Sequence, residues 1–211
     1  MSGLFVVFEG GDGVGKSTQQ RLLAERLTEA GIAQLTTRQP GGTPAGATIR
    51  SILLDPATGD LAPKAEALLY AADKAQHVHE VVRPALARGE VVVCDRYVDS
   101  LLAYQGAGRV LSSSEVAEIS DWATDGLLPD LTVLLDLDPV RGVADIVAKD
   151  RIEAAGADFH QRVREGFLSL AGADPGRYLV LPARDDRSAI AEVVWRRVRE
   201  LLSERPGNFG S

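Results

Sequence analysis

Short runs of apolar residues recur along the chain, separated by longer segments of mixed polarity. Several runs are nearly continuous in valine, leucine or phenylalanine, which is typical of strands buried on both faces of a parallel sheet. The runs, of which the second is the weakest, are Leu4–Phe8, Ala33–Thr37, Val91–Cys94, Leu131–Leu137 and Tyr178–Leu181. The pattern therefore predicts four or five buried strands.

The segments between these runs have helical character. Lys16–Ala30 carries Leu23 and Leu27 four residues apart and stops at Gly31, a residue type that favours helix ends. The other predicted helices are Ala65–Arg88, Ser113–Asp125, Phe159–Ala171 and Ser188–Ser203. Because strands and helices alternate, we predict an α/β fold with a mainly parallel sheet.

A chain of 211 residues is of the size of one domain, which we place at residues 1–204. The remainder, residues 205–211, is rich in glycine and proline, and we expect a flexible tail there.

A glycine-rich loop follows the first strand and opens the first helix. Its residues, Gly10, Gly11, Asp12, Gly13, Val14, Gly15, Lys16 and Ser17, fit G-x-x-x-x-G-K-[ST], and Thr18 follows. Glycines let successive N–H groups point at a phosphate, and the helix N-terminus adds partial positive charge. Lys16 can reach the β- and γ-phosphates, while the Ser17 hydroxyl can bind Mg²⁺. The loop therefore predicts a nucleoside triphosphate site.

Composition and charge exclude several other classes of protein. No apolar run approaches about 18 residues, and the N-terminus lacks the basic region of a secretory signal. The single cysteine, Cys94, cannot form an internal disulfide, so we expect a cytoplasmic protein. A net charge of −7 disfavours a wide nucleic-acid interface but allows a small anionic ligand. A switch GTPase is disfavoured because the only asparagine, Asn208, lies in the tail, where no base-reading N-K-x-D motif exists.

Three further segments are more specific than the loop. They read RQPGGT at residues 38–43, DRYVDS at 95–100 followed by AYQG at 103–106, and DRIE at 150–153. Their order and spacing resemble the thymidylate kinase family, from Phe5 to about Leu202. The resemblance implies a P-loop NTPase fold with a five-stranded parallel sheet flanked by helices, a small lid and a homodimer. It also implies transfer of the γ-phosphoryl group of ATP to dTMP, giving dTDP and ADP, with Mg²⁺ as cofactor.

The chemistry of such a transfer explains why arginines matter. A phosphate monoester has a second pKa near ~6, so the attacking oxygen is already anionic and needs no general base. Catalysis then consists of bringing two anions together and stabilising their charge. By resemblance, Arg96 and Arg50 hold the acceptor phosphate. Asp95 lies beside Mg²⁺ together with Ser17, and Asp12 lies near the sugar 3′-hydroxyl and the phosphates.

Recognition of the acceptor nucleoside can also be placed by resemblance. Tyr70 and Lys74 are four residues apart and share a helix face. The family has an aromatic residue stacked on thymine at Tyr70, and at Lys74 it usually has an arginine that contacts thymine O4. Tyr104 corresponds to a tyrosine that crowds the 2′ position, and Gln105 lines that region. The other acceptor-site residues implied are Gln39, Pro40, Ser100, Asp150 and Glu153, with the Gln39–Pro40 bond expected to be cis.

A lid is expected at about residues 148–158, where Asp150 and Glu153 match lid acids. Arg151 is its expected catalytic cation, because Gly13 stands where one family subtype carries an arginine in the loop. Closure of the lid would exclude water from the γ-phosphate.

Some positions depart from the common family pattern. Gln39, Lys74 and Leu101 differ from the usual residues, and the lid is poor in arginine. Two alternatives therefore stay open: a kinase for a modified or different pyrimidine deoxynucleoside monophosphate, and a nucleotide-binding module with weak transferase activity. Adenylate kinase-like enzymes fit less well, because of the DRY and AYQ segments.

Overall fold

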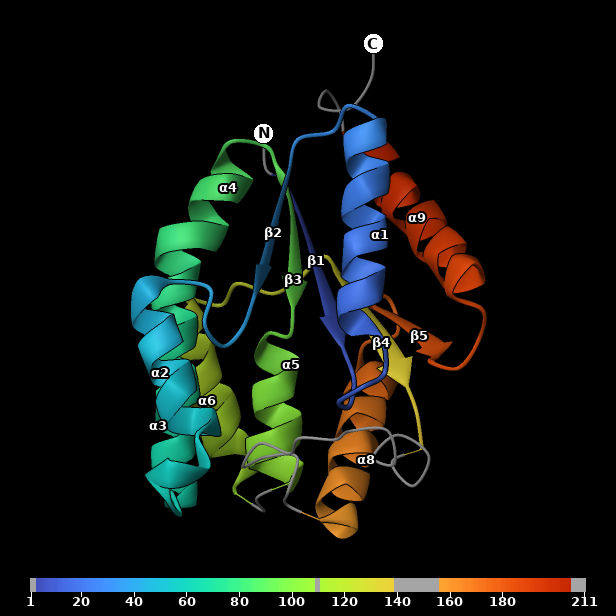
Figure 1. Ribbon diagram of the computed structural model, residues 1–211. Coiled ribbons are helices and arrows are strands. Elements are labelled where there is room, and N and C mark those ends of the chain that lie inside the picture. Colours follow the sequence, from blue (N-terminus) through green and yellow to red (C-terminus); the bar gives the residue numbers. More distant parts are fainter. Residues whose placement is uncertain (1–2, 109–110, 139–155, 206–211) are drawn as a thin grey trace.

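One parallel sheet with helices on both faces forms the molecule (Figure 1). The structure is a computed structural model that describes residues 3–108, 111–138 and 156–205. Its strands are β1 (Leu4–Glu9), β2 (Gln34–Arg38), β3 (Val91–Asp95), β4 (Leu131–Asp136) and β5 (Tyr178–Pro182). They lie in the order β2-β3-β1-β4-β5, and every neighbouring pair is parallel. The predicted α/β fold with five parallel strands is confirmed.

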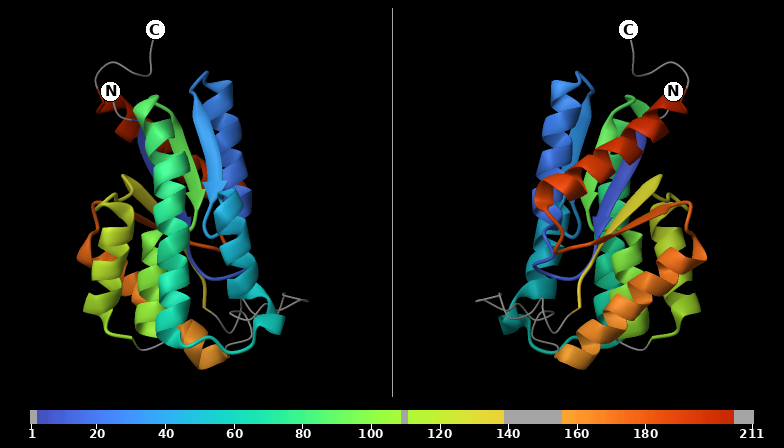
Figure 2. Two further views of the ribbon diagram at one scale, coloured as in Figure 1. Left: turned by 90° about the vertical axis from the view of Figure 1, so that its left-hand side faces the viewer. Right: turned by 90° about the vertical axis from the view of Figure 1, so that its right-hand side faces the viewer.

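The helices between the strands alternate with them along the chain. They are α1 (Lys16–Glu29), α2 (Pro44–Leu54), α3 (Pro63–His77), α4 (Arg83–Ala87), α5 (Val98–Leu101), α6 (Ser113–Thr124), α8 (Ala157–Ala173) and α9 (Arg187–Ser203). A 3₁₀ turn covers Pro56–Thr58, and π-helical turns cover Val78–Val82 and Leu102–Gly108. Figure 2 shows α1 and α9 on one side of the sheet and α3 with α4 on the other.

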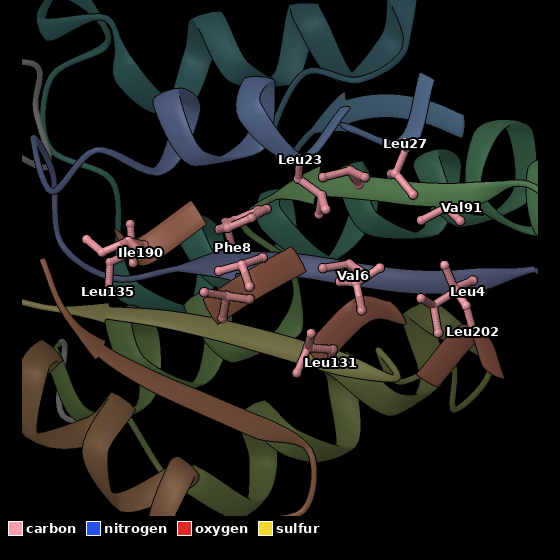
Figure 3. Packing of buried hydrophobic residues seen from close by; sticks show 14 of the residues in the cluster. Leu4, Val6, Phe8, Leu23, Leu27, Val91, Leu131, Leu135, Ile190 and Leu202 are labelled. Atoms are coloured by element: carbon pink, nitrogen blue, oxygen red, sulfur yellow. The ribbon is translucent and has the colours of Figure 1, made fainter. Parts of the chain in front are cut away.

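The central strand β1 explains why helices are needed on both faces. Its residues alternate between two clusters of buried side chains, with Leu4, Val6 and Phe8 in one and Phe5 and Val7 in the other. The first cluster packs against α1 and α9, as Figure 3 shows, with Leu23, Leu27, Ile190 and Leu202 around the strand. Since both faces of β1 are apolar, the strand reads as a continuous apolar run.

The observed elements differ from the sequence predictions in three places. Helix α2 was not predicted, because Pro44 and Gly46 make its first turn resemble a loop, although Thr43 caps it by accepting from the Gly46 N–H. The helical segment after Arg96, comprising α5 and Leu102–Gly108, was also not predicted. The predicted single helix over residues 65–88 contains the wider turn Val78–Val82 between α3 and α4.

Because all five strands are parallel, their carboxyl ends meet at one edge of the sheet, where ligands bind in open α/β folds. The other edge holds Gly3, whose carbonyl accepts a hydrogen bond from Arg205, and Arg205 also pairs with Asp130 at 2.5 Å. These contacts hold Arg205, the first residue of the expected tail, and the remainder of that tail lies outside the described residues. Within the described ranges, no helix has the length and apolar character needed to cross a membrane.

Candidate active site

The glycine-rich loop links β1 to α1 in a conformation that only glycines adopt easily. Gly10, Gly13 and Gly15 have φ angles of 130°, 71° and 95°. At Gly10 a Cβ atom would lie 2.4 Å from the Leu135 carbonyl oxygen, so a side chain is also excluded by contact. Val14 points into the core instead, where it is buried. The loop thus turns tightly while its polar groups face a cavity.

Lys16 is buried beneath the loop, and its ammonium donates to the carbonyls of Gly10 (3.2 Å) and Gly11 (2.6 Å). Burial, helped by the neighbouring Arg96 cation, lowers the pKa of Lys16 to about 8. An anion in the loop would relieve this cost by pairing with the ammonium. The amine is therefore already in place for a phosphate.

Arg96 connects the loop to the carboxyl end of β3. Its guanidinium donates to Asp12 Oδ1 (2.6 Å), to the Gly10 carbonyl (3.0 Å) and to Ser100 Oγ (3.2 Å). Burial alone would raise the pKa of Asp12, but Arg96 and Lys16 lower it to about 2. Tyr104 adds a hydrogen bond from its hydroxyl to Asp12 Oδ2 at 3.3 Å. These contacts fix a cation beside the loop.

Glu9 is a residue of this site that the sequence analysis missed. It is fully buried, and it accepts hydrogen bonds from the Tyr97 N–H (2.8 Å), the Ser100 N–H (3.1 Å) and the Ser100 hydroxyl (2.6 Å). Burial raises its pKa. Because these donors follow Arg96 directly in the chain, Glu9 shapes the turn on which Arg96 lies. Its place at the end of the first strand, immediately before the loop, was the available signal.

Two cavities open at this edge of the sheet. The loop cavity is lined by Asp12, Gly13, Gly15, Lys16, Ser17, Thr18, Arg38, Gln39, Arg50, Asp95 and Arg96. The inner cavity is lined by Asp12, Gln39, Pro40, Arg50, Leu54, Tyr70, Lys74, Arg96, Ser100, Leu101, Tyr104 and Gln105. Four residues belong to both walls: Asp12, Gln39, Arg50 and Arg96.

The segment between β2 and α2 forms one side of both cavities. The Gln39–Pro40 bond is cis, as expected from the resemblance. Arg50 donates to the Pro40 carbonyl (3.0 Å), and Asp73 Oδ1 accepts from the Gly41 N–H (2.9 Å). Since a Cβ at Gly41 would lie 2.9 Å from Arg50 Cδ, the glycine allows the arginine to lie across the loop.

His77 supports the same segment from α3. Its Nδ1 lies 2.8 Å from Gln39 Nε2, and its Nε2 lies 2.7 Å from Thr37 Oγ1. An amide N–H can only donate, so Nδ1 accepts and Nε2–H donates to Thr37, which requires a neutral ring. Burial, with a smaller effect of the Lys74 cation, lowers the pKa of His77 to about 4, which is consistent with that state.

Most residues expected in the site lie around these two cavities. Gly10, Gly11 and Val14 are part of the loop but are not among the residues that line the loop cavity. Asp150, Arg151 and Glu153 lie outside the described residues, as does most of the expected lid at 148–158. Arg38 lines the loop cavity and was missed, although its position at the end of β2 was a signal.

The arrangement defines a class of protein. A triphosphate loop opens into one cavity, and two arginines of its wall, Arg50 and Arg96, also line a second cavity. No His, Cys, Asp or Glu cluster within the described ranges is suited to hold a metal by protein ligands alone. The fold and site therefore define a P-loop phosphotransferase whose acceptor is itself an anion, which is the class of the nucleoside monophosphate kinases.

Comparison with known proteins identifies the family within this class. The family model for thymidylate kinase matches residues 8–194. The thymidylate kinase of Cutibacterium acnes is 60% identical over 203 residues, covering 96% of this chain and 100% of the relative. That of Clavibacter michiganensis is 55% identical over 207 residues, covering 96% and 98%. A crystal structure of thymidylate kinase from Ehrlichia chaffeensis matches with a TM-score of 0.78 at 31% identity, covering 94% of this chain and 100% of the other. The chain belongs to the thymidylate kinase family.

Proposed function

We propose that the protein transfers the γ-phosphoryl group of ATP to the 5′-phosphate of dTMP, forming dTDP and ADP. The observation that carries the proposal is the wall shared by the two cavities. Arg50 and Arg96 line both cavities, so one pair of guanidinium groups can hold two phosphates near each other. The family membership supports dTMP as the acceptor, and it gives no support to the alternative acceptors or to a binding module.

The residues present can perform each part of this transfer. A dTMP phosphate oxygen attacks the γ-phosphorus, a new P–O bond forms, and the bond to the β–γ bridging oxygen breaks with its electron pair leaving on ADP. Lys16 and the loop N–H groups hold the β- and γ-phosphates. Arg96 and Arg50 offset the repulsion between the two anions, and Asp12 keeps Arg96 oriented toward the junction.

Mg²⁺ fits the residues at the mouth of the loop. Ser17 Oγ lies 3.4 Å from Asp95 Oδ2, and Asp95 Oδ1 is buried without a hydrogen-bond partner. Protein Mg²⁺ sites use one or two such oxygens together with substrate phosphates and waters, so Ser17 and Asp95 would suffice. When bound, the ion would neutralise charge on the β- and γ-phosphate oxygens.

The inner cavity has features that suit a pyrimidine deoxynucleotide. Tyr70 offers an aromatic face on α3, and Lys74 lies one turn further along the same wall. Tyr104 is buried and packs edge-to-face against Phe159 and Phe167, so its ring is held close to where a sugar would lie. This rigid ring would disfavour a 2′-hydroxyl.

The test is a coupled assay that measures ADP and dTDP formation with Mg-ATP and a panel of acceptors. We expect turnover with dTMP to exceed turnover with dUMP, dCMP and 5-substituted analogues. A clear preference for another base would overturn the assignment of thymine. Absence of ADP and dTDP above background would overturn transferase activity altogether.

A homodimer and a cytoplasmic location belong to the same proposal. Helices α3 and α6 pack against each other, and Leu68 on α3, Trp122 on α6 and Leu128 after α6 expose large apolar side chains. These exposed apolar side chains on and beside two packed helices suit contact with a second copy of the chain. The cytoplasm is the compartment in which ATP and deoxynucleoside monophosphates are abundant.

A further inference from the structure

Asp73 on α3 is a fully buried carboxylate that lines neither of the two cavities. Its Oδ1 atom accepts from the Gly41 N–H at 2.9 Å, whereas Oδ2 is buried without a hydrogen-bond partner among the described residues. Burial of a carboxylate oxygen without a partner costs free energy, so packing alone does not explain why an acid stands at this position. The groups that the carboxylate contacts indicate a different reason.

The carboxylate lies against both parts of the chain that position Arg50. One part is the loop before α2, where a Cβ at Gly41 would lie 2.9 Å from Arg50 Cδ, so the arginine stem rests on the residue that Asp73 holds. The other part is the first turn of α2, the helix that carries Arg50. A Cβ at Gly46, in that turn, would lie 2.4 Å from Asp73 Oδ1. Close packing through two glycines thus joins the acid to the arginine.

Hydrogen bonds join the same two side chains through a single peptide group. The Arg50 guanidinium donates to the Pro40 carbonyl at 3.0 Å, and the N–H of that same peptide, which belongs to Gly41, donates to Asp73 at 2.9 Å. A rotation of the peptide that broke one of these bonds would therefore break the other. In such a row each hydrogen bond polarises the next, so the carboxylate makes the carbonyl a better acceptor for the guanidinium.

We propose that Asp73 is a positioning residue for the acceptor phosphate, because it fixes the Pro40–Gly41 peptide whose carbonyl orients Arg50. The inference rests on the proposed function and deepens it, since Arg50 is one of the two arginines that line both cavities. Asp73 acts through the peptide and the arginine and is not itself a catalytic residue. Its effect is therefore on the phosphate of the acceptor and not on the nucleoside.

This distinction gives Asp73→Ala a specific signature. The Gly41 N–H loses its partner, the peptide is free to turn, and Arg50 loses the carbonyl that orients it. We expect the affinity for dTMP to fall about tenfold, which is the effect of weakening one charge-assisted hydrogen bond. The affinity for thymidine, which has no phosphate, should stay unchanged. A substitution that merely loosened the inner cavity would weaken the binding of both ligands.

Calorimetric titrations of dTMP and of thymidine into the wild type, Asp73→Ala and Asp73→Asn measure these affinities. Asparagine is the matched variant, because its side-chain oxygen can accept from the Gly41 N–H at the same place. We expect Asp73→Asn to bind dTMP within about threefold of the wild type. Unchanged dTMP affinity in Asp73→Ala, an equal loss for both ligands, or an Asp73→Asn variant as weak as Asp73→Ala would overturn the proposal.

Gly46→Ala disturbs the same carboxylate from the side of α2 and needs no change at Asp73. Its methyl group would lie 2.4 Å from Asp73 Oδ1, so the carboxylate has to leave its place beside the Gly41 N–H. We expect the same selective loss of dTMP affinity. Adding Gly46→Ala to Asp73→Ala should cause no further loss, because the clash is then absent. Losses that add in the double variant, or a single variant that binds dTMP like the wild type, contradict the inference.

The same titrations, read beside the coupled assay, separate this inference from the proposed function. If Asp73→Ala loses affinity for dTMP alone while the wild type forms no dTDP from ATP, the proposed function fails and the inference stands. If the wild type forms dTDP and Asp73→Ala binds dTMP as tightly, the inference fails by itself. A wild type that binds no dTMP contradicts both.

Discussion

Arg96 occupies a backbone conformation that residues with side chains rarely adopt, with a φ of 65°. Its surroundings explain how this conformation persists. The Glu9 carboxylate accepts from two N–H groups that follow Arg96, and the Arg96 N–H itself donates to the Phe8 carbonyl at 2.9 Å. The buried acid at the end of β1 thus orients the cation at the end of β3. Backbone strain of this kind is found at functional sites, where the surrounding structure over-determines the conformation.

Replacing Arg96 by lysine (R96K) should lower kcat by on the order of a hundredfold, because an ammonium cannot contact Asp12 and Gly10 simultaneously as the planar guanidinium does. Steady-state rates at saturating ATP and dTMP measure the effect. The matched control is R21K on the exposed face of α1, where Arg21 pairs with Glu25, and it should leave kcat unchanged. An R96K rate within about twofold of wild type would contradict this role.

At this scale the sequence predicts motif residues better than their supports. The loop glycines, Lys16 and Arg96 stand in patterns whose spacing carries the chemistry. Glu9 could not be assigned a role, because its partners Tyr97 and Ser100 lie 88 and 91 residues away in the chain. The roles expected for Lys16 and Arg96 stay predictions until variants are measured.

Helix α3 shows how one element serves both the core and the site. Tyr70 and Lys74 line the inner cavity, while His77, one turn further on, holds Gln39 and Thr37. The helical pattern and the i, i+4 spacing of Tyr70 and Lys74 were predictable from sequence. The wider turn Val78–Val82 was not, because apolar periodicity alone does not distinguish a π turn from an α turn.

Acid should weaken the tie that His77 makes between α3 and β2. Its pKa is lowered from 6.5 to about 4 in the folded protein, so the unfolded chain binds the extra proton between these values. The contribution of His77 to the free energy of unfolding is therefore fully present above pH 6.5. It falls as pH approaches 4, by up to about 3 kcal/mol. Urea unfolding between pH 7 and pH 4 gives the free energy of unfolding of the wild type and of His77→Gln. The difference between the two proteins at each pH measures the contribution of His77.

Glu9 and Asp73 titrate with the opposite sign, because burial raises their pKa values, and the comparison of the two proteins removes their effect. His77→Gln keeps an amide able to bond Thr37 and Gln39, and its stability should fall less steeply over this range. Parallel pH dependences in the two proteins would rule out His77 as the source.

At the scale of the whole molecule, the α/β class follows from the alternation of apolar runs with helical segments. The order of the strands does not, because β2 pairs with β3 and leaves β1 between β3 and β4 through contacts between distant segments. The inner cavity likewise depends on α2 and on the helical segment after Arg96, which the sequence reading missed. The family resemblance supplied the number of strands, five, which the apolar runs alone left at four or five.

Association of two copies is a property of the whole molecule that one surface residue can test. Trp122 is 82% exposed on α6, and Trp122→Asp should convert a dimer to a monomer by placing charges in an apolar interface. Light scattering coupled to size-exclusion chromatography measures the mass. Val180→Asp is the control, since Val180 is also exposed but lies on β5, at the far side of the sheet (Figure 1). A wild-type monomer, or a dimeric Trp122→Asp variant, would contradict the proposed interface.

The hydrogen bond between Arg205 and Gly3 has a practical consequence for attachment. It brings the two ends of the described chain together at the edge of the sheet where the strands begin (Figure 1). Both cavities lie at the opposite edge. A fluorophore, affinity handle or solid support joined near either end would approach from the rear of the molecule. Immobilised protein should therefore keep its openings facing the solution, which favours this chain as a sensor for nucleotides.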